Sequence, residues 1–127
     1  MKLSKINRKF IYLISPNKIK NNNFYVELIK IFKLKKVAFF QLRLKRENNK
    51  NKIIIAKKIH KICKKYKVKF LINDDPILAR KLNADGCHLG QKDMNVIKAR
   101  KVLKKKIIGI TCHNSIKLAK NAIKNKA

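Results

Sequence analysis

The sequence predicts an α/β fold in which parallel strands alternate with helices that cover them. Short apolar runs of strand length recur along the 127 residues, and longer segments with apolar residues at helical spacing lie between them. The strand candidates are continuously apolar, which is typical of parallel strands covered on both faces. Because 46% of the residues are hydrophobic, the chain can fill one core, and we treat residues 1–127 as one domain.

Five strand–helix units are expected. The strands should lie at residues 9–15, 37–42, 68–72, 86–89 and 107–111, and the helices at 24–35, 51–66, 75–82, 94–103 and 115–124. The helix at 51–66 has the clearest pattern, because its apolar residues recur every three or four positions and leave lysines on the other face. Asp75 followed by Pro76 predicts a helix start, with the carboxylate as N-cap and proline at the first helical position.

Two architectures fit such units: a (β/α) barrel and a doubly wound open sheet. No GxGxxG or GxxxxGK sequence follows any strand, so nothing supports a nucleotide-binding sheet. Polar residues collect where the strands end: Asn73, Asp74 and Asp93 follow predicted strands, and Thr111 is the last residue of one. Because this end is the catalytic face of barrels, the distribution favours the barrel.

The end of the second strand carries three hydrogen-bonding side chains. Gln41, Arg43 and Lys45 alternate with leucines, so in strand geometry they point to one side. An amide and two cations in this arrangement predict a phosphate site. Asp74 and Asp93 could hold a hard cation such as Mg2+, which takes one or two protein carboxylates together with phosphate and water oxygens. The residues therefore predict a site for a diphosphate bridged by a cation.

Several residues also have simpler interpretations. Asp93 could instead cap the helix that follows it, and Asp85, which precedes a glycine, is typical of a turn. His88 lies in a short strand and is expected to be buried and hydrogen-bonded, whereas His60 is expected at the surface. Cys63 belongs to the apolar stripe of its helix and is expected to pack in the core.

The net charge of +29, from 35 Lys+Arg against 6 Asp+Glu, is typical of proteins that bind nucleic acids or anionic membranes. The lysines are spread through every segment with asparagine and isoleucine, a mixture that AT-rich coding produces without selection for a partner. We therefore expect no specific nucleic acid and no membrane as partner. If the charge does have a partner, the alternative function is a basic nucleic-acid-binding module; a non-catalytic remnant is a further alternative.

The sequence predicts a soluble cytoplasmic protein. It has three cysteines without CxxC spacing, no secretory signal and no apolar run of about 20 residues.

At these motifs the chain resembles the thiamine phosphate synthases. The matching sequences are QLRLK at 41–45, IND at 72–74, ADGCHLGQKD at 84–93 and IGIT at 108–111. The resemblance covers essentially the whole chain and implies a (β/α)8 barrel of the TIM type. It implies a transferase of thiamine biosynthesis that joins hydroxymethylpyrimidine diphosphate to thiazole phosphate and releases pyrophosphate, with Mg2+ as cofactor.

The resemblance also implies roles for single residues. The pyrimidine diphosphate would be bound by Gln41, Arg43, Lys45, Asn73 and Thr111, with Arg43, Lys45 and Thr111 taking part in catalysis and Asp74 and Asp93 holding Mg2+. Thr111 stands where the family usually has serine, and Asp75 where it usually has arginine. A thiazole tautomerase resembling TenI is a lesser alternative, because a tautomerase has no diphosphate to bind.

The family's barrel has eight strands, whereas only about the first five units are expected in residues 1–127. The family places a second lysine and a glycine-rich thiazole-phosphate site in the later units. We therefore expect a C-terminally truncated chain that holds the pyrimidine half of the site and by itself binds Mg2+ and pyrimidine diphosphate only weakly. Its open sheet would be completed by self-association or by a second polypeptide.

Overall fold

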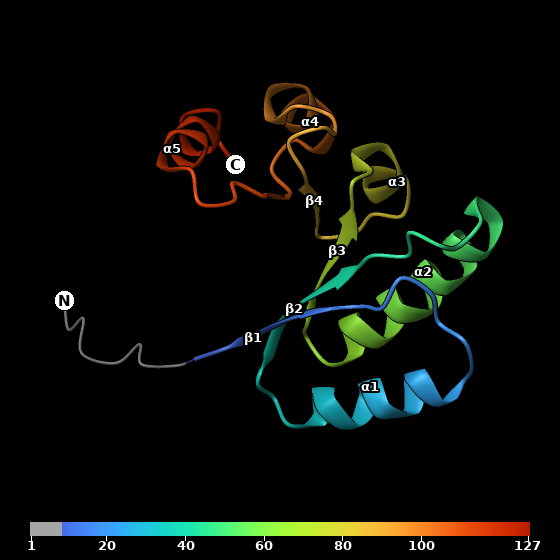
Figure 1. Ribbon diagram of the computed structural model, residues 1–127. Coiled ribbons are helices and arrows are strands. Elements are labelled where there is room, and N and C mark those ends of the chain that lie inside the picture. Colours follow the sequence, from blue (N-terminus) through green and yellow to red (C-terminus); the bar gives the residue numbers. More distant parts are fainter. Residues whose placement is uncertain (1–8) are drawn as a thin grey trace.

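Five parallel strands alternate with five helices in the computed structural model, which describes residues 9–127 (Figure 1). The strands are β1 (Ile11–Ile14), β2 (Val37–Leu42), β3 (Lys69–Asn73), β4 (Gly86–Leu89) and β5 (Ile107–Ile110). The helices are α1 (Asn23–Lys33), α2 (Asn49–Lys65), α3 (Pro76–Lys81), α4 (Val96–Leu103) and α5 (Ile116–Lys124). All predicted elements are confirmed, with ends that differ by two residues or fewer.

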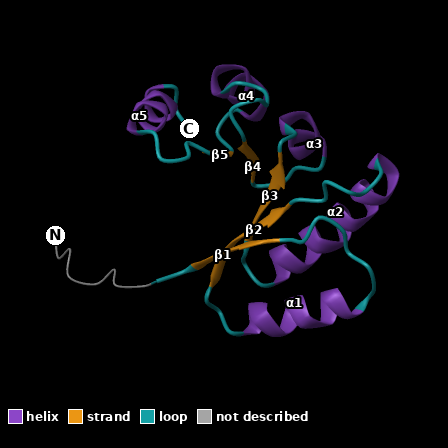
Figure 2. Cartoon of the chain, in the orientation of Figure 1, coloured by secondary structure: helices purple, strands orange, loops and turns teal. Residues whose placement is uncertain are grey.

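The strands form one sheet in the order β1-β2-β3-β4-β5, and every neighbouring pair is parallel. Spatial order therefore equals chain order, as in a barrel, whereas a doubly wound sheet reverses its order at a switch point. Figure 2 shows the strands fanning around a curve with the helices along the outer side. Within residues 9–127, β1 and β5 each pair on one side only, so the sheet is open. It corresponds to part of a barrel.

The core lies between the sheet and the helices. Phe40, Phe70 and Leu89 point outward from β2, β3 and β4 and are fully buried. Ile59 and Cys63 of α2 belong to the same cluster, which confirms the packing role expected for Cys63. No helix of the described residues is both long enough and apolar enough to cross a membrane.

The surface position expected for His60 is wrong. Only 8% of this residue is exposed, and its ring stacks on Phe70 with 5.0 Å between ring centroids. The reason is the phase of α2, whose buried residues are Ala56, Ile59, His60 and Cys63. These positions follow the three- and four-residue spacing of a single stripe, and His60 lies within it.

In the part of the chain that the structure describes, the helices lie on the outer face of the sheet and none lies on the inner face (Figure 2). Partners in register on parallel strands share a face, so two rows of side chains cross this inner face. One row consists of Ile14, Gln41, Leu71, Gly86 and Ile107, and the next, nearer the carboxyl ends, of Asn73, His88 and Gly109. A side chain at Gly86 would overlap the carbonyl of Ile107, and one at Gly109 would overlap the His88 ring. Both glycines therefore permit this packing.

Candidate active site at the carboxyl ends of the strands

A chain of hydrogen bonds joins the first three strands on the inner face. The Tyr12 hydroxyl donates to Gln41 Oε1 over 2.8 Å, and Gln41 Nε2 donates to Asn73 Oδ1 over 2.6 Å. Gln41 is only 3% exposed, so both ends of its amide find partners within the protein. Gln41 and Asn73, two of the predicted substrate-binding residues, are therefore in direct contact.

Burial still alternates beyond the end of β2: Leu44 is as buried as Leu42, whereas Arg43 is half-buried and Lys45 is exposed. β2 ends at Leu42, and Arg43 and Lys45 lie in the segment that follows. Arg43 turns toward the end of β1, where its Nη1 donates to Asn17 Oδ1 over 2.8 Å. Lys45 instead reaches the end of β3. The two cations therefore flank the end of the sheet from different directions.

The backbone of this segment is held by the end of β1. The buried Ser15 hydroxyl accepts a hydrogen bond from the Arg43 backbone N–H over 2.8 Å, and Arg46 N–H donates to the Asn17 carbonyl over 3.1 Å. The segment after β1 thus positions the basic segment after β2.

Asp74 forms the centre of the polar cluster. Its backbone has a positive φ of 66°, and its N–H donates to the His88 carbonyl over 2.8 Å, which links it to β4. Aspartate tolerates this left-handed conformation better than most residues. Lys45 Nζ lies 3.4 Å from Asp74 Oδ2, in an ion pair that is partly exposed. The turn after β3 thus presents a carboxylate beside a cation.

Asp93 is the second carboxyl group at this place. Burial raises the pKa of Asp74, and the Asp93 carboxyl raises this pKa further by hydrogen bonding and by like charge, while Lys45 acts in the opposite sense. Asp93 Oδ2 accepts a hydrogen bond from Gly90 N–H over 2.7 Å and so closes its own loop. The capping role considered for Asp93 is wrong, because Asn95 caps α4.

The two carboxyl groups suit a hard cation that takes part of its coordination from a ligand. The described residues contain no group of three or more His, Cys, Asp or Glu side chains that could enclose a metal. Mg2+ commonly uses one or two carboxylates together with phosphate and water oxygens. A cation between Asp74 and Asp93 would also remove the repulsion that raises the pKa of Asp74.

Thr111 lies directly after β5 and contacts His88 of the neighbouring strand β4. Its Oγ1 is 2.8 Å from His88 Nε2, and its carbonyl accepts a hydrogen bond from Gln91 Nε2 over 2.8 Å. Burial lowers the pKa of His88, with Asp74 and Asp93 acting in the opposite sense. His88 is half-buried and hydrogen-bonded, close to the expectation from the sequence.

The other two aspartates support the fold. Asp75 Oδ1 accepts a hydrogen bond from Leu78 N–H over 2.9 Å at the start of α3, which confirms the predicted N-cap. Asp85 Oδ2 accepts from Phe70 N–H over 2.8 Å, and Asp85 N–H donates to the Phe70 carbonyl over 2.9 Å. Asp85 thus joins the turn before β4 to the start of β3. It lies at the amino ends of the strands, whereas Asp74 lies at their carboxyl ends.

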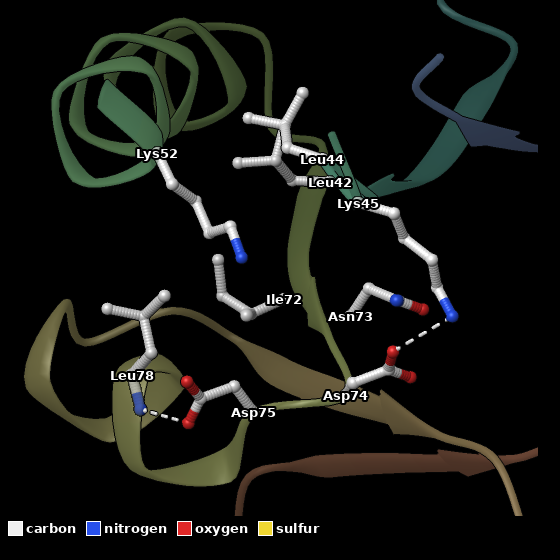
Figure 3. A pocket seen from close by; sticks show the side chains of 9 residues that line it. All are labelled: Leu42, Leu44, Lys45, Lys52, Ile72, Asn73, Asp74, Asp75 and Leu78. Carbon is white, nitrogen blue, oxygen red and sulfur yellow. Dashed lines mark hydrogen bonds and ion pairs between the residues drawn. The ribbon is translucent and has the colours of Figure 1, made fainter. Parts of the chain in front are cut away.

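A pocket of about 270 Å³ borders Asp74 on the side of the helices (Figure 3). Its walls come from β2, β3, α2 and α3, and Lys52 points into it from α2. Lys45, Asn73 and Asp74 line this pocket, whereas Gln41, Arg43 and Thr111 do not. The predicted residues therefore meet only in part. Gln41 contacts Asn73, and Asp74 meets Lys45 and Asp93, whereas Arg43 and Thr111 contact residues that were not predicted.

The sequence reasoning missed the contributions of β1. Tyr12, Ser15 and Asn17 contact Gln41 or Arg43, yet none was a candidate. Ser15 and Asn17 follow the first strand as the other candidates follow theirs, so the position of polar residues after strands is the signal that marks them. Tyr12 shares a face with Gln41 by register, and no motif marks it.

Comparisons with known proteins agree with the fold. Residues 11–127 match the model of the TMP-TENI family, described as thiamine monophosphate synthase. The chain is 71% identical to the thiamine-phosphate synthase of Pelagibacter ubique over 127 residues, which are 100% of this chain and 61% of that protein. The thiamine-phosphate synthase of Marinobacter nauticus is 33% identical over 117 residues, 91% of this chain and 53% of the relative. A solved structure, the thiamine phosphate pyrophosphorylase from Pyrococcus furiosus, matches with a TM-score of 0.79 and 26% identity over 95% of this chain and 58% of that chain.

The parallel strands in chain order define a barrel-type α/β protein in which polar and charged side chains meet at the carboxyl ends of the strands. The chain belongs to the thiamine monophosphate synthase family. It spans 61% of the length of its Pelagibacter relative and 58% of the Pyrococcus chain.

Proposed function

We propose that this chain carries the part of a thiamine-phosphate synthase site that binds hydroxymethylpyrimidine diphosphate and Mg2+. In the proposed reaction, the bond between the pyrimidine methylene carbon and the diphosphate oxygen breaks. The methylene carbon then bonds to the nitrogen of thiazole phosphate, and thiamine phosphate and pyrophosphate are the products. The observation that carries the proposal is the meeting of Lys45, Asp74 and Asp93 at one end of the sheet.

The proposed roles follow from charge and hydrogen-bonding capacity. Arg43 and Lys45 would stabilise the negative charge that develops on the departing diphosphate, and the hydroxyl of Thr111 would bind the same group. Asp74 and Asp93 would hold Mg2+, which when bound supplies further positive charge to the leaving group. Gln41 and Asn73 would orient the substrate. No protein nucleophile is required, because the thiazole nitrogen of the second substrate forms the new bond.

The carboxyl pair supports the metal assignment on electrostatic grounds. With no cation between them, ionising Asp74 is opposed by burial and by Asp93, and Lys45 compensates only in part. A divalent cation favours the ionised form of both groups. We therefore expect Mg2+ to bind more tightly as pH rises through the raised pKa of Asp74.

The test is calorimetric titration of the 127-residue chain with hydroxymethylpyrimidine diphosphate at fixed Mg2+. Asp74→Asn and Asp93→Asn should each weaken binding by about tenfold or more, because each removes a proposed metal ligand. Asp75→Asn is the matched control: it removes the same charge at the neighbouring position, and asparagine still caps α3.

The control should bind within about twofold of the wild type, since N-cap aspartate and asparagine are nearly equivalent. Equal affinity of the wild type and Asp74→Asn would contradict the metal assignment. An equal loss in Asp75→Asn and Asp74→Asn would show that the effect comes from net charge and not from ligation.

A further inference from the structure

The hydrogen bonds from Tyr12 through Gln41 to Asn73 have a direction, and this direction decides what Asn73 can offer a ligand. We propose that Tyr12 is a positioning residue that fixes which way the Gln41 and Asn73 amides face, so that Asn73 presents its NH2 group to the substrate. The substrate part of this inference rests on the proposed function, whereas the orientation of the amides does not.

The direction follows from the chemistry of the three groups. A side-chain amide has an accepting oxygen at one end and a donating NH2 at the other. Tyr12 donates to the Gln41 oxygen, which leaves the Gln41 NH2 to donate to the Asn73 oxygen. Once its oxygen is engaged, Asn73 has its NH2 group left. Among residues 9–127, this group donates to no protein acceptor.

The opposite arrangement is possible in principle for two amides in contact. Gln41 would then donate to the Tyr12 oxygen and accept from Asn73, and Asn73 would present a carbonyl oxygen to the ligand. The contacts of Tyr12 disfavour it. The Tyr12 hydroxyl would then accept from Gln41, and its own proton would need another acceptor. Among residues 9–127, the Gln41 oxygen is the only protein acceptor within hydrogen-bonding distance of this hydroxyl.

The position of the Tyr12 ring is fixed by its neighbour. Tyr12 pairs with Phe39 across β1 and β2, and the two rings stack with 5.6 Å between centroids and 25° between planes. Gln41 lies two residues beyond Phe39 on the same face. The phenol therefore reaches along the sheet toward the carboxyl end, where its hydroxyl meets the Gln41 amide.

The consequence concerns the class of ligand group that fits. Asp74 and Asp93 place negative charge beside Asn73, and an outward carbonyl oxygen would add a further acceptor there. An outward NH2 instead adds a donor to the cations Lys45 and Arg43. We infer that Asn73 binds an acceptor on the substrate, either a diphosphate oxygen or a ring nitrogen, and that Tyr12 sets this polarity without touching the substrate.

The test follows the side-chain amide signals of the 15N-labelled 127-residue chain by NMR. In Tyr12→Phe the ring and its stacking on Phe39 remain and the O–H is lost. The Gln41 oxygen then loses its donor, and the amide is free to rotate away from Asn73. We therefore expect the Gln41 NH2 protons to exchange with water about tenfold faster than in the wild type. Tyr25→Phe is the matched control, because Tyr25 lies on α1, and it should leave both amides unchanged.

A second variant tests the direction itself. In Gln41→Glu the carboxylate still accepts from Tyr12 and cannot donate, so the Asn73 NH2 must turn toward residue 41. Its proton signals should then move downfield and exchange more slowly than in the wild type. Unchanged Asn73 signals in this variant, or Gln41 signals in Tyr12→Phe identical to those of the wild type, would overturn the inference.

Titration with Mg2+ and inorganic pyrophosphate separates this inference from the proposed function. A shift of the Asn73 NH2 signals in the wild type that is several-fold weaker in Tyr12→Phe supports both. If pyrophosphate moves no signal of Asn73, Asp74 or Asp93, the proposed function fails, and the amide signals of the variants still decide the orientation. Equal shifts in the wild type and Tyr12→Phe would overturn the role of Tyr12 while the proposed function stands.

Discussion

Replacing Gly109 by alanine should break one hydrogen bond of the site without disrupting the sheet. The added Cβ would lie 2.5 Å from His88 Nδ1, whereas ordinary contact begins at 3.4 Å. The ring must therefore move by roughly 1 Å, and a side chain that is only half-buried can do so. The movement carries Nε2 away from Thr111 Oγ1, now at 2.8 Å, and should stretch that contact beyond hydrogen-bonding distance.

The size of the effect follows from what is lost. A hydrogen bond between neutral groups contributes about 0.5–1.5 kcal/mol net, and Thr111 is accessible enough for water to replace part of it. Gly86→Ala is the informative contrast, because its Cβ would overlap the carbonyl of Ile107, a backbone atom in the neighbouring strand. Relief then requires β4 and β5 to separate, which should cost at least the ~1–3 kcal/mol that is typical of overpacked cores.

The assay combines urea unfolding, followed by circular dichroism, with NMR of 15N-labelled histidine. Gly109→Ala should lower the free energy of unfolding by about 1 kcal/mol and shift the His88 Nε2 resonance. Gly86→Ala should lower the free energy by clearly more. Equal destabilisation by the two substitutions, or an unchanged His88 resonance in Gly109→Ala, would refute the reasoning that the first clash is relieved by a side chain and the second is not.

Two further predictions concern the aspartates. Because the pKa of Asp74 is raised in the folded state, its contribution to stability is full below the ordinary value of 3.8 and is lost as pH rises through the raised value. Asp93→Asn removes the like charge, so urea unfolding between about pH 3 and pH 7 should show a smaller loss than the wild type; an unchanged slope would contradict the coupling. Asp85→Ala leaves the Phe70 N–H without its acceptor and should cost about 1–3 kcal/mol in the same assay. Asp85→Asn keeps an acceptor and should cost less, and equal costs would assign the effect to the charge of Asp85 beside Lys69.

The elements could be predicted from the sequence because each depends on local patterns. The five apolar runs became the five strands, and the pairing of Asp75 with Pro76 marked the start of α3 as expected. The error came where one residue of helix phase decides burial, because His60 was placed at the surface although it lies beside Ile59 on the buried stripe of α2. The different partners of Arg43 and Lys45 could not be predicted, since they follow the end of β2 and contact residues of other parts of the chain.

The site could be predicted only as a set of strand ends. Gln41, Asn73, Asp74 and Thr111 all lie at the carboxyl ends of strands or directly after them, as the barrel expectation required. Which of them meet could not be read from the sequence, because each contact crosses from one strand to another. Parallel strands are joined through helices of different length, and connection length does not determine register.

The register between β4 and β5 depends on a glycine, because only a residue without a side chain fits opposite the His88 ring. Asn73, His88 and Gly109 are partners in one row, and the absence of a side chain at Gly109 lets the His88 ring lie where it reaches Thr111. A shift of one residue between β4 and β5 would place Ile108 or Ile110 against that ring and turn His88 away from Thr111. Gly109 of the IGIT segment is therefore as important to the geometry of the site as Thr111, two residues later.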